Sequence, residues 1–143
     1  MKLVIAADHG GYDIKEAIIK ALTAKGHSFT DLGTDNGKDS VDYPVFAKAL
    51  CKELQDGKAE LGILCCGTGI GMSMTANKQK GIRAAVLSDA FSAEMTRRHN
   101  NANVLCLGGR VLSEEQAVAL AQLFVDTPFE GGRHQRRIDM MEE

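Results

Sequence analysis

Cys66 stands before a glycine-rich run that could support proton transfer on a carbonyl compound. The residues that follow it are Gly67-Thr68-Gly69-Ile70-Gly71. Glycines between a strand and a helix let backbone N–H groups turn inward, which makes an anion-binding nest in front of a helix N-terminus. Amide dipoles at the mouth of such a nest favour the thiolate form of a cysteine. A thiolate beside N–H donors can abstract a proton α to a carbonyl while the donors hold the resulting enediolate.

The glycine run on its own leaves its ligand open. A dinucleotide or phosphate loop is the alternative, but the G-x-G-x-x-G pattern fails at Met72, and no Gly-Lys-Ser/Thr follows. The alternative for Cys66 is a buried structural cysteine, which is the usual fate of a free thiol. We assign that structural role to Cys51, Cys65 and Cys106.

Two histidine-containing pairs add further acid–base groups. Asp8-His9 follows the first predicted strand, where a carboxylate and an imidazole can move hydroxyl protons or contact a phosphate. A turn-forming aspartate beside an exposed histidine explains this pair equally well. His99-Asn100 closes a predicted helix. A histidine at that position often only complements the helix dipole, and the residues alone favour that role for His99.

Basic residues gather near the end of the chain. Arg133, His134, Arg136 and Arg137 lie within five residues. Arg133 and Arg137 are four apart, so they share one face of a helix and could grip a phosphate together. A solvated basic terminus is the alternative. Arg110, which follows a second pair of glycines, favours the phosphate-binding interpretation.

The composition places limits on the class of protein. The chain has 143 residues, of which 44% are hydrophobic and 25% charged, with a formal net charge of −2. These values are typical of one globular domain and give no case for a nucleic-acid or membrane surface. The first residues lack the apolar stretch of a signal peptide, so we expect a cytoplasmic protein. The four cysteines show no C-x-x-C or His-rich metal spacing, so we expect reduced thiols and no metal site.

Strand-like and helix-like segments alternate along the sequence. This alternation predicts right-handed βαβ crossovers and a parallel sheet whose short apolar strands are covered on both faces. We expect an α/β fold, a Rossmann-like three-layer sandwich with a five-stranded parallel sheet, formed as one domain over 1–143 with a helical tail at about 128–143. Strands are predicted at 2–7, 28–32, 61–65, 83–87 and 103–107, and helices at 12–25, 44–54, after Gly71 to about 78, 90–99 and from Ser113 to 124.

The predicted fold brings the reactive groups to one edge. Ligands of parallel α/β sheets bind at the carboxyl ends of the strands. The segments that follow the predicted strands there are Asp8-His9, Cys66 with its glycines, Ser88-Asp89, and Gly108-Gly109-Arg110. Several groups capable of acid–base chemistry are therefore expected on one rim.

With these residues in place, the chain resembles the ribose-5-phosphate isomerase B family, within a broader group that includes allose-6-phosphate and galactose-6-phosphate isomerases. The resemblance covers nearly the full length, and its specificity comes from the whole set of motifs in this order. The motifs are Ala7-Asp8-His9-Gly10-Gly11, Asp42-Tyr43-Pro44, Cys66-Gly67-Thr68-Gly69-Ile70-Gly71, Ala76-Asn77-Lys78, Gly81-Ile82-Arg83-Ala84, Arg98-His99-Asn100, Asn103-Val104-Leu105 and Glu130-Gly131-Gly132-Arg133-His134.

The resemblance implies a role for each residue at a matching position. Cys66 would carry the proton between C1 and C2, and His99 would assist opening of the furanose ring. The resemblance implies no cofactor and no metal, and a homodimer or tetramer whose sites combine residues of two subunits, with the tail packed on the partner. The remaining roles are hydroxyl protons for Thr68 and Asp8, the anion hole for the amides of Gly67, Gly69, Ile70 and Gly71, a sugar contact for Asn100, and phosphate binding for His9, Arg110, Arg133 and Arg137.

The expected reaction is interconversion of ribose 5-phosphate and ribulose 5-phosphate, a step of the pentose phosphate pathway. One branch of the family carries a glutamate after the glycine run as its base, whereas this chain has Met72 there and keeps Cys66. The galactose-6-phosphate isomerase subunits tend to lack the pairing of Cys66 with His99. An isomerase of a six-carbon sugar phosphate remains the alternative. A non-catalytic phosphate- or nucleotide-binding module is a more distant one.

Overall fold

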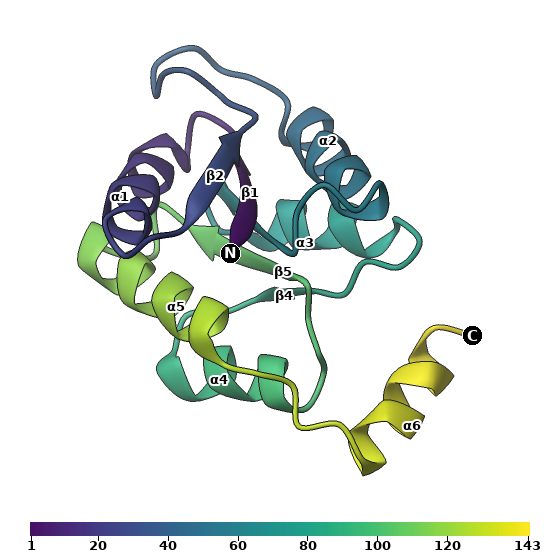
Figure 1. Cartoon of the computed structure of the whole chain (residues 1–143). Helices are drawn as coiled ribbons and strands as arrows, with labels where there is room; N and C mark the ends of the chain where they lie inside the picture. Colours follow the sequence, from purple (N-terminus) through teal and green to yellow (C-terminus); the bar gives the residue numbers. More distant parts are fainter.

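The computed structural model describes all residues 1–143 and contains one parallel sheet (Figure 1). The strands run in the order β2-β1-β3-β5-β4, and every neighbouring pair is parallel. The α/β fold with a five-stranded parallel sheet is therefore confirmed. The strands are β1 (Lys2–Ala7), β2 (Ser28–Asp31), β3 (Leu61–Cys66), β4 (Ala84–Val86) and β5 (Val104–Gly108).

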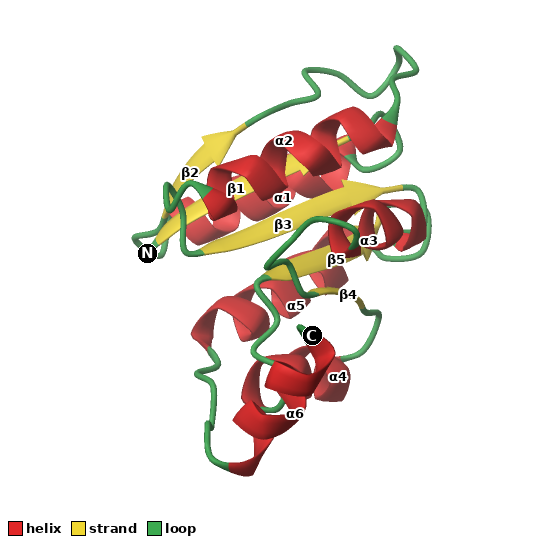
Figure 2. Ribbon diagram, turned by 90° about the vertical axis from the view of Figure 1, so that its right-hand side faces the viewer, coloured by secondary structure: helices red, strands yellow, loops and turns green.

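Helices cover both faces of this sheet and make the expected three layers (Figures 1 and 2). Helices α1, α4 and α5 bury apolar side chains against one face, and α2 and α3 bury theirs against the other. Their bounds are α1 (Tyr12–Thr23), α2 (Tyr43–Gln55), α3 (Ile70–Asn77), α4 (Ala90–Arg98), α5 (Glu114–Asp126) and, in the tail, α6 (Arg133–Met141). No helix combines the length and apolar character that a membrane crossing needs.

The strands differ in burial according to their place in the sheet. All residues of β3 and β5 are buried, and β1 is exposed only at its first residue. The edge strands β2 and β4 have no fully buried residue. The expectation of strands covered on both faces is correct for the centre and wrong for the edges, because an edge strand has neighbours on one side only.

Local capping explains where several helices begin. Ser113 accepts a hydrogen bond from the Gln116 N–H, and the Gln116 side chain accepts one from the Ser113 N–H, so the two form a capping box at the predicted start of this helix. Asp89 caps α4 by accepting a single hydrogen bond from the Ser92 N–H. That hydrogen bond lowers the pKa of the Asp89 carboxyl.

The strand order defines a crevice where β1 and β3 lie side by side. The chain leaves β1 toward β2 on one side of this point, and it leaves β3 toward β4 on the other side. Such a switch point is the usual ligand position in open α/β sheets. The loops after these strands pack tightly: a Cβ on Gly11 would lie 2.4 Å from the carbonyl carbon of Cys65. Only glycine fits at position 11, and the two loops are thereby held against each other.

The tail stands apart from the layers (Figures 1 and 2). Helix α6 follows the Gly131-Gly132 break, where both glycines have positive φ. It is anchored by the buried side chains of His134 and Ile138 and by an ion pair of 2.8 Å between Arg83 and Glu142. The helical tail predicted at about 128–143 is confirmed, as a helix over Arg133–Met141.

Candidate active site

Cys66 is the last residue of β3, and its thiol lies beneath the glycine loop. The residue is only 5% exposed, and its Sγ accepts a hydrogen bond of 3.1 Å from the Gly69 N–H. Gly69 has φ +82 and is the residue before α3. This left-handed backbone, which glycine adopts without a Cβ penalty, turns the amide back toward the sulfur. The sequence places Cys66 just after the strand, whereas the structure includes it as the final strand residue.

A cleft of about 460 Å³ opens beside this thiol. Seven residues predicted as site residues line it, and they come from the end of β3, the start of α3 and the loops after β1, β3 and β5. These seven are Asp8, Cys66, Gly67, Thr68, Ile70, Gly71 and Arg110.

Asp8 and Thr68 are fixed in this cleft by backbone contacts. Asp8 is 6% exposed and its Oδ1 accepts a hydrogen bond of 2.9 Å from the Gly10 N–H. The Thr68 hydroxyl accepts from the Ile70 N–H at 3.2 Å. Each side chain keeps hydrogen-bonding capacity, since a carboxylate has a second oxygen and a hydroxyl can still donate.

Arg110 brings a positive charge to the same loop. Its backbone N–H donates to the Gly67 carbonyl at 2.9 Å, and the N–H of Gly109 donates to the Cys66 carbonyl at 2.8 Å. A Cβ on Gly67 would lie 3.2 Å from a guanidinium nitrogen of Arg110. The missing side chain at position 67 thus lets the guanidinium lie against the anion-binding loop.

His9 lies next to the cleft but does not line it. Its Nδ1 accepts a hydrogen bond of 3.2 Å from the Val41 N–H, which holds the ring against the loop between β2 and α2. Because Nδ1 accepts this hydrogen bond, the neutral His9 ring carries its proton on Nε2.

Two lining residues were missed as site residues by the sequence analysis. Tyr43 and Met74 complete the wall of the cleft. A Cβ on Gly71 would lie 2.6 Å from the Tyr43 ring, so Gly71 is the position that lets this ring approach the loop. The signal for Tyr43 was its place in the motif Asp42-Tyr43-Pro44. Met74 gave no signal beyond its helical position.

Four predicted site residues lie elsewhere in the chain. His99 and Asn100 follow the carboxyl end of α4, and Arg133 and Arg137 lie on α6. The Asn103 carbonyl, shortly after His99, accepts from the N–H of Gly62 at the start of β3. These four residues therefore sit toward the amino edge of the sheet. The length of β3, roughly 15 Å at the strand rise per residue, separates that edge from Cys66.

His99 has close neighbours at that edge. Its ring stacks on His134, with centroids 4.2 Å apart and planes inclined by 14°. Glu130 approaches both rings, at 3.9 Å from Nε2 of His99 and 3.5 Å from Nε2 of His134. The helix-dipole role favoured from the sequence therefore does not describe all the surroundings of His99.

The other three cysteines are buried away from the cleft. Burial raises the pKa of the Cys51 thiol to about 11. Burial also raises the pKa of Cys65 and of Cys106, in both cases with a further contribution from neighbouring thiols. All four cysteines are free, and these three remain protonated near neutral pH. This supports the structural role assigned to them.

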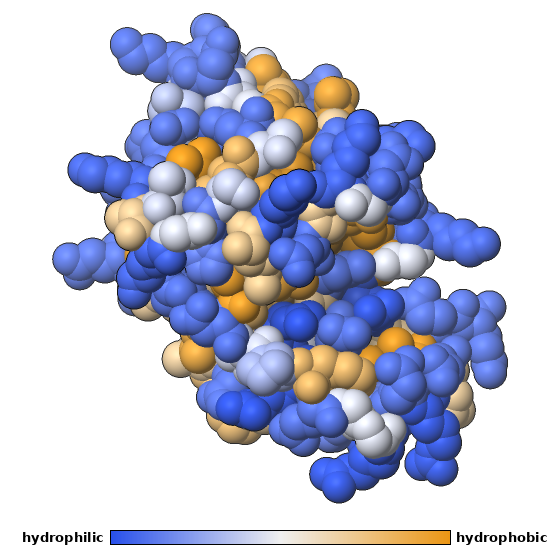
Figure 3. Space-filling model, viewed as in Figure 1, coloured by the Kyte–Doolittle hydropathy of each residue, from blue (hydrophilic) through white to orange (hydrophobic).

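A larger cavity, about 630 Å³, lies away from Cys66. It opens between the segment Asn77–Ala85 and the end of α6, and it corresponds to the indentation on the right of the molecule (Figure 3). Arg83 in its wall already donates to Glu142 and to the carbonyls of Asn100 and Asn101. The cavity contains no thiol or histidine, so the smaller cleft is the better candidate for proton transfer.

The fold and this cleft define a class of protein: a parallel α/β protein with a thiol and an amide-lined anion site at the switch point of its sheet. The model of the family described as Ribose/Galactose Isomerase matches residues 3–141. The chain belongs to this family of sugar-phosphate isomerases, as the sequence resemblance implied.

Individual relatives agree over nearly the whole chain. A putative sugar phosphate isomerase of Bacillus subtilis, YwlF, is 46% identical and the match covers 96% of this chain and 93% of the relative. The structure of ribose-5-phosphate isomerase B from Clostridium thermocellum superimposes with a TM-score of 0.96 at 41% identity, covering 99% of this chain and 95% of that chain. Ribose-5-phosphate isomerase B from Mycoplasma genitalium, solved with bound ribulose-5-phosphate, gives a TM-score of 0.92 at 41% identity, with 99% and 93% covered.

Proposed function

We propose that this chain interconverts ribose 5-phosphate and ribulose 5-phosphate, with Cys66 as the base. The observation that carries the proposal is the Cys66 thiol, which lies in a cleft beside an amide donor and the Arg110 guanidinium. The Mycoplasma genitalium relative, solved with ribulose-5-phosphate, supports the five-carbon substrate.

The proton follows a path that the cleft residues can provide. In the open-chain aldose, the Cys66 thiolate takes the proton from C2, the C1–C2 double bond forms, and the charge moves to O1. The loop amides hold the resulting cis-enediolate. A proton then passes from O2 to O1, with Asp8 and Thr68 as the hydroxyl-contacting groups. The Cys66 thiol finally returns its proton to C1, and the carbonyl forms at C2.

Phosphate binding is assigned to basic side chains around the cleft. Arg110 is the arginine that lines it within one chain. His9, held through Nδ1, can donate from Nε2. Guanidinium groups suit phosphate because they donate two parallel hydrogen bonds. Arg133 and Arg137 would add to this grip, but only if they belong to another copy of the chain.

A second copy would complete the site. His99 for ring opening, Asn100 for the sugar, and Arg133 and Arg137 for the phosphate all lie at the edge opposite Cys66 in their own chain. We therefore assign them to the cleft of a partner in a homodimer, on which the tail at about 128–143 packs, while 1–143 remains one domain. Two exposed apolar side chains that line the cleft, Ile70 and Met74, offer a surface for such contact.

The test is an assay of ketose formation from ribose 5-phosphate by chelator-treated protein, together with exchange of the C2 proton into solvent. Cys66→Ala should lower both by about 10²- to 10⁴-fold, the usual range for loss of a general base. A variant that kept full turnover would overturn the assignment of the base. Saturable nucleotide binding without any proton exchange would instead indicate a non-catalytic module.

The sugar length is tested separately. Comparison of kcat/KM for ribose 5-phosphate and allose 6-phosphate decides between the two substrates. The six-carbon alternative stays open because some relatives, such as YwlF, are named only as putative sugar phosphate isomerases. A higher kcat/KM for allose 6-phosphate would overturn the five-carbon assignment and leave the role of Cys66 intact.

A further inference from the structure

We infer that His99, Glu130 and His134 form a binding site for a transition-metal cation of the zinc type. Their ligating atoms, one from each residue, all lie within 4.8 Å of one another. Two imidazoles and one carboxylate are a ligand set that suits Zn²⁺ and Co²⁺ better than Mg²⁺ or Ca²⁺. The three residues are distant from the Cys66 cleft of the same chain.

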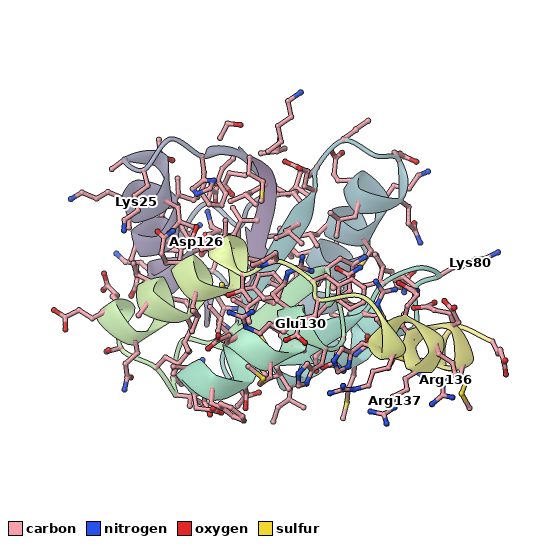
Figure 4. All side chains as sticks on the ribbon, turned by 60° about the horizontal axis from the view of Figure 1, so that its bottom comes forward. Lys25, Lys80, Asp126, Glu130, Arg136 and Arg137 are labelled. Carbon is pink, nitrogen blue, oxygen red and sulfur yellow. The ribbon has the colours of Figure 1, made fainter.

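The backbone holds two of these ligands in a fixed relation. Glu130 donates its N–H to the Arg98 carbonyl at 3.1 Å, which ties the residue to the end of α4. His134 comes four residues later, in the first turn of α6, and is only 7% exposed. Glu130 lies in the connection between α5 and α6, where Figure 4 labels it. These two residues provide the rigid part of the site.

His99 is the ligand that must move. A tetrahedral zinc site places its ligand atoms roughly 3.3 Å apart, given metal–ligand distances of about 2.0–2.1 Å. The stacked rings direct their Nε2 atoms side by side toward Glu130, so one ring has to turn for both nitrogens to meet a single ion. His99 and Glu130 are 41% and 44% exposed, which leaves their side chains room to rotate.

Neighbouring arginines are engaged elsewhere and do not occupy the carboxylate. Arg98 pairs with Glu94 at 2.8 Å. Arg97 donates to the Thr127 and Ala102 carbonyls and to Asn101. Glu130 is therefore free to face the two histidines. The exposed side of the site leaves a fourth position for water.

A cation bound at this site would inhibit the enzyme. This consequence rests on the proposed function, in which the His99 imidazole assists ring opening in a partner's cleft. A metal on Nε2 removes the lone pair or the proton that such a step uses. The cation would thus act as a reversible inhibitor of the proposed isomerase reaction.

The test is titration of chelator-treated full-length protein with Co²⁺ under visible absorption. We expect d–d bands that saturate at one cobalt per chain, without the thiolate charge-transfer band that binding at Cys66 would give. Glu130→Gln and His134→Gln should each weaken binding by about tenfold or more, since even outer-shell changes cost that much. Glu94→Gln, a carboxylate one turn away that pairs with Arg98, is the matched control and should bind as the wild type does.

Each remaining outcome decides the question. Absence of saturable binding, or binding that survives both substitutions, overturns the site. A charge-transfer band that disappears in Cys66→Ser assigns the metal to the cleft and also overturns it. Cobalt binding with the expected variant pattern but no isomerase activity would support the metal site while the proposed function fails. Inhibition by Zn²⁺ that Glu130→Gln relieves would support both.

Discussion

The Gly69 N–H donates a 3.1 Å hydrogen bond to the Sγ of Cys66, and the same glycine stands at the N-terminus of α3. One residue therefore joins the thiol to the anion-binding end of a helix. Its φ of +82° lies in the left-handed region, which glycine adopts without a Cβ penalty. The thiol and the amides that would hold the enediolate are positioned by the same turn of backbone.

Replacement of the thiol should remove the chemistry and leave the fold. We expect Cys66→Ala to lower kcat by about 10²- to 10⁴-fold, the usual range for loss of a general base. The measurement is ketose formation at saturating ribose 5-phosphate, with circular dichroism to check folding. Cys51→Ala is the matched control, because this buried thiol lies in the same apolar cluster and has no place in the cleft. Equal losses in both variants would contradict a specific role for Cys66.

The turn at Gly69 can be tested against a glycine of similar backbone shape. Gly69 and Gly81 have φ of +82 and +77, so alanine should destabilise either position by about 1–2 kcal/mol. A Cβ on Gly69 would also meet the Leu107 carbonyl carbon and a Val86 methyl, each at 3.0 Å, whereas Gly81 faces open space. We therefore expect Gly69→Ala to lose activity and Gly81→Ala to keep it. Urea unfolding and the ketose assay together separate the two effects, and an inactive Gly81→Ala would contradict this account.

Much of the site could be predicted because its residues are close in sequence to strand ends. The carboxyl ends of β1, β3 and β5 bring Asp8, Cys66 and Arg110 to one cleft, as the βαβ pattern required. Tyr43 could not be assigned in this way, because it reaches the cleft from the start of α2 through contact with Gly71. Such a contact depends on packing across the loop, which spacing along the chain does not encode.

The surroundings of His99 could not be predicted from the sequence either. Its sequence position at a helix end indicates only a capping role, and its stacking on His134 arises because the tail returns to the end of α4. Strand order was also beyond the sequence analysis, since alternating elements are compatible with several orders. The order found places the loops after β1 and β3 at the switch point, and this explains why the two glycine-rich loops touch.

Stability should decline in alkaline solution. Burial raises the pKa of Cys51 from its ordinary value to about 11. Below pH 9 the thiol is protonated in both states; as pH rises from 9 toward 11, the unfolded chain loses the proton first and is favoured. The pKa of Lys15 is also raised, because hydrogen bonds to Asp31 and Glu16 outweigh the lowering by burial, and its stabilisation is likewise lost as pH rises.

The measurement is urea unfolding between pH 8 and about 11. The free energy of unfolding should fall with pH for the wild type and fall less steeply for Cys51→Ala, which lacks the shifted thiol. Lys52→Met offers a control for general charge loss, since Lys52 forms only an exposed pair with Asp56. Parallel pH curves for the wild type and Cys51→Ala would contradict the assignment to this thiol.

The tail arginines should affect substrate binding more than turnover. Arg133 and Arg137 share a face of α6 and have no ion-pair partner in their own chain. We expect Arg137→Ala to raise KM for ribose 5-phosphate by about tenfold or more, because a charge-assisted contact to phosphate contributes roughly 1.5–3 kcal/mol. Arg136→Ala is the control for the loss of one exposed positive charge from the same helix (Figure 4). Unchanged KM for Arg137→Ala would remove it from the phosphate site.

Mixing two inactive variants can show whether sites are shared between copies. If Cys66 of one chain works with His99 of another, Cys66→Ala and His99→Asn each lack one half of every site. A dimer that contains one chain of each kind has one site with both mutations and one site with neither. Random reassembly of equal amounts makes half of the dimers mixed, so about a quarter of wild-type activity should return. The measurement is ketose formation after joint unfolding and refolding, with each variant refolded alone as the control. If both chains used only their own residues, the mixture would stay as inactive as its components, and the assignment of His99 to a partner's cleft would be wrong.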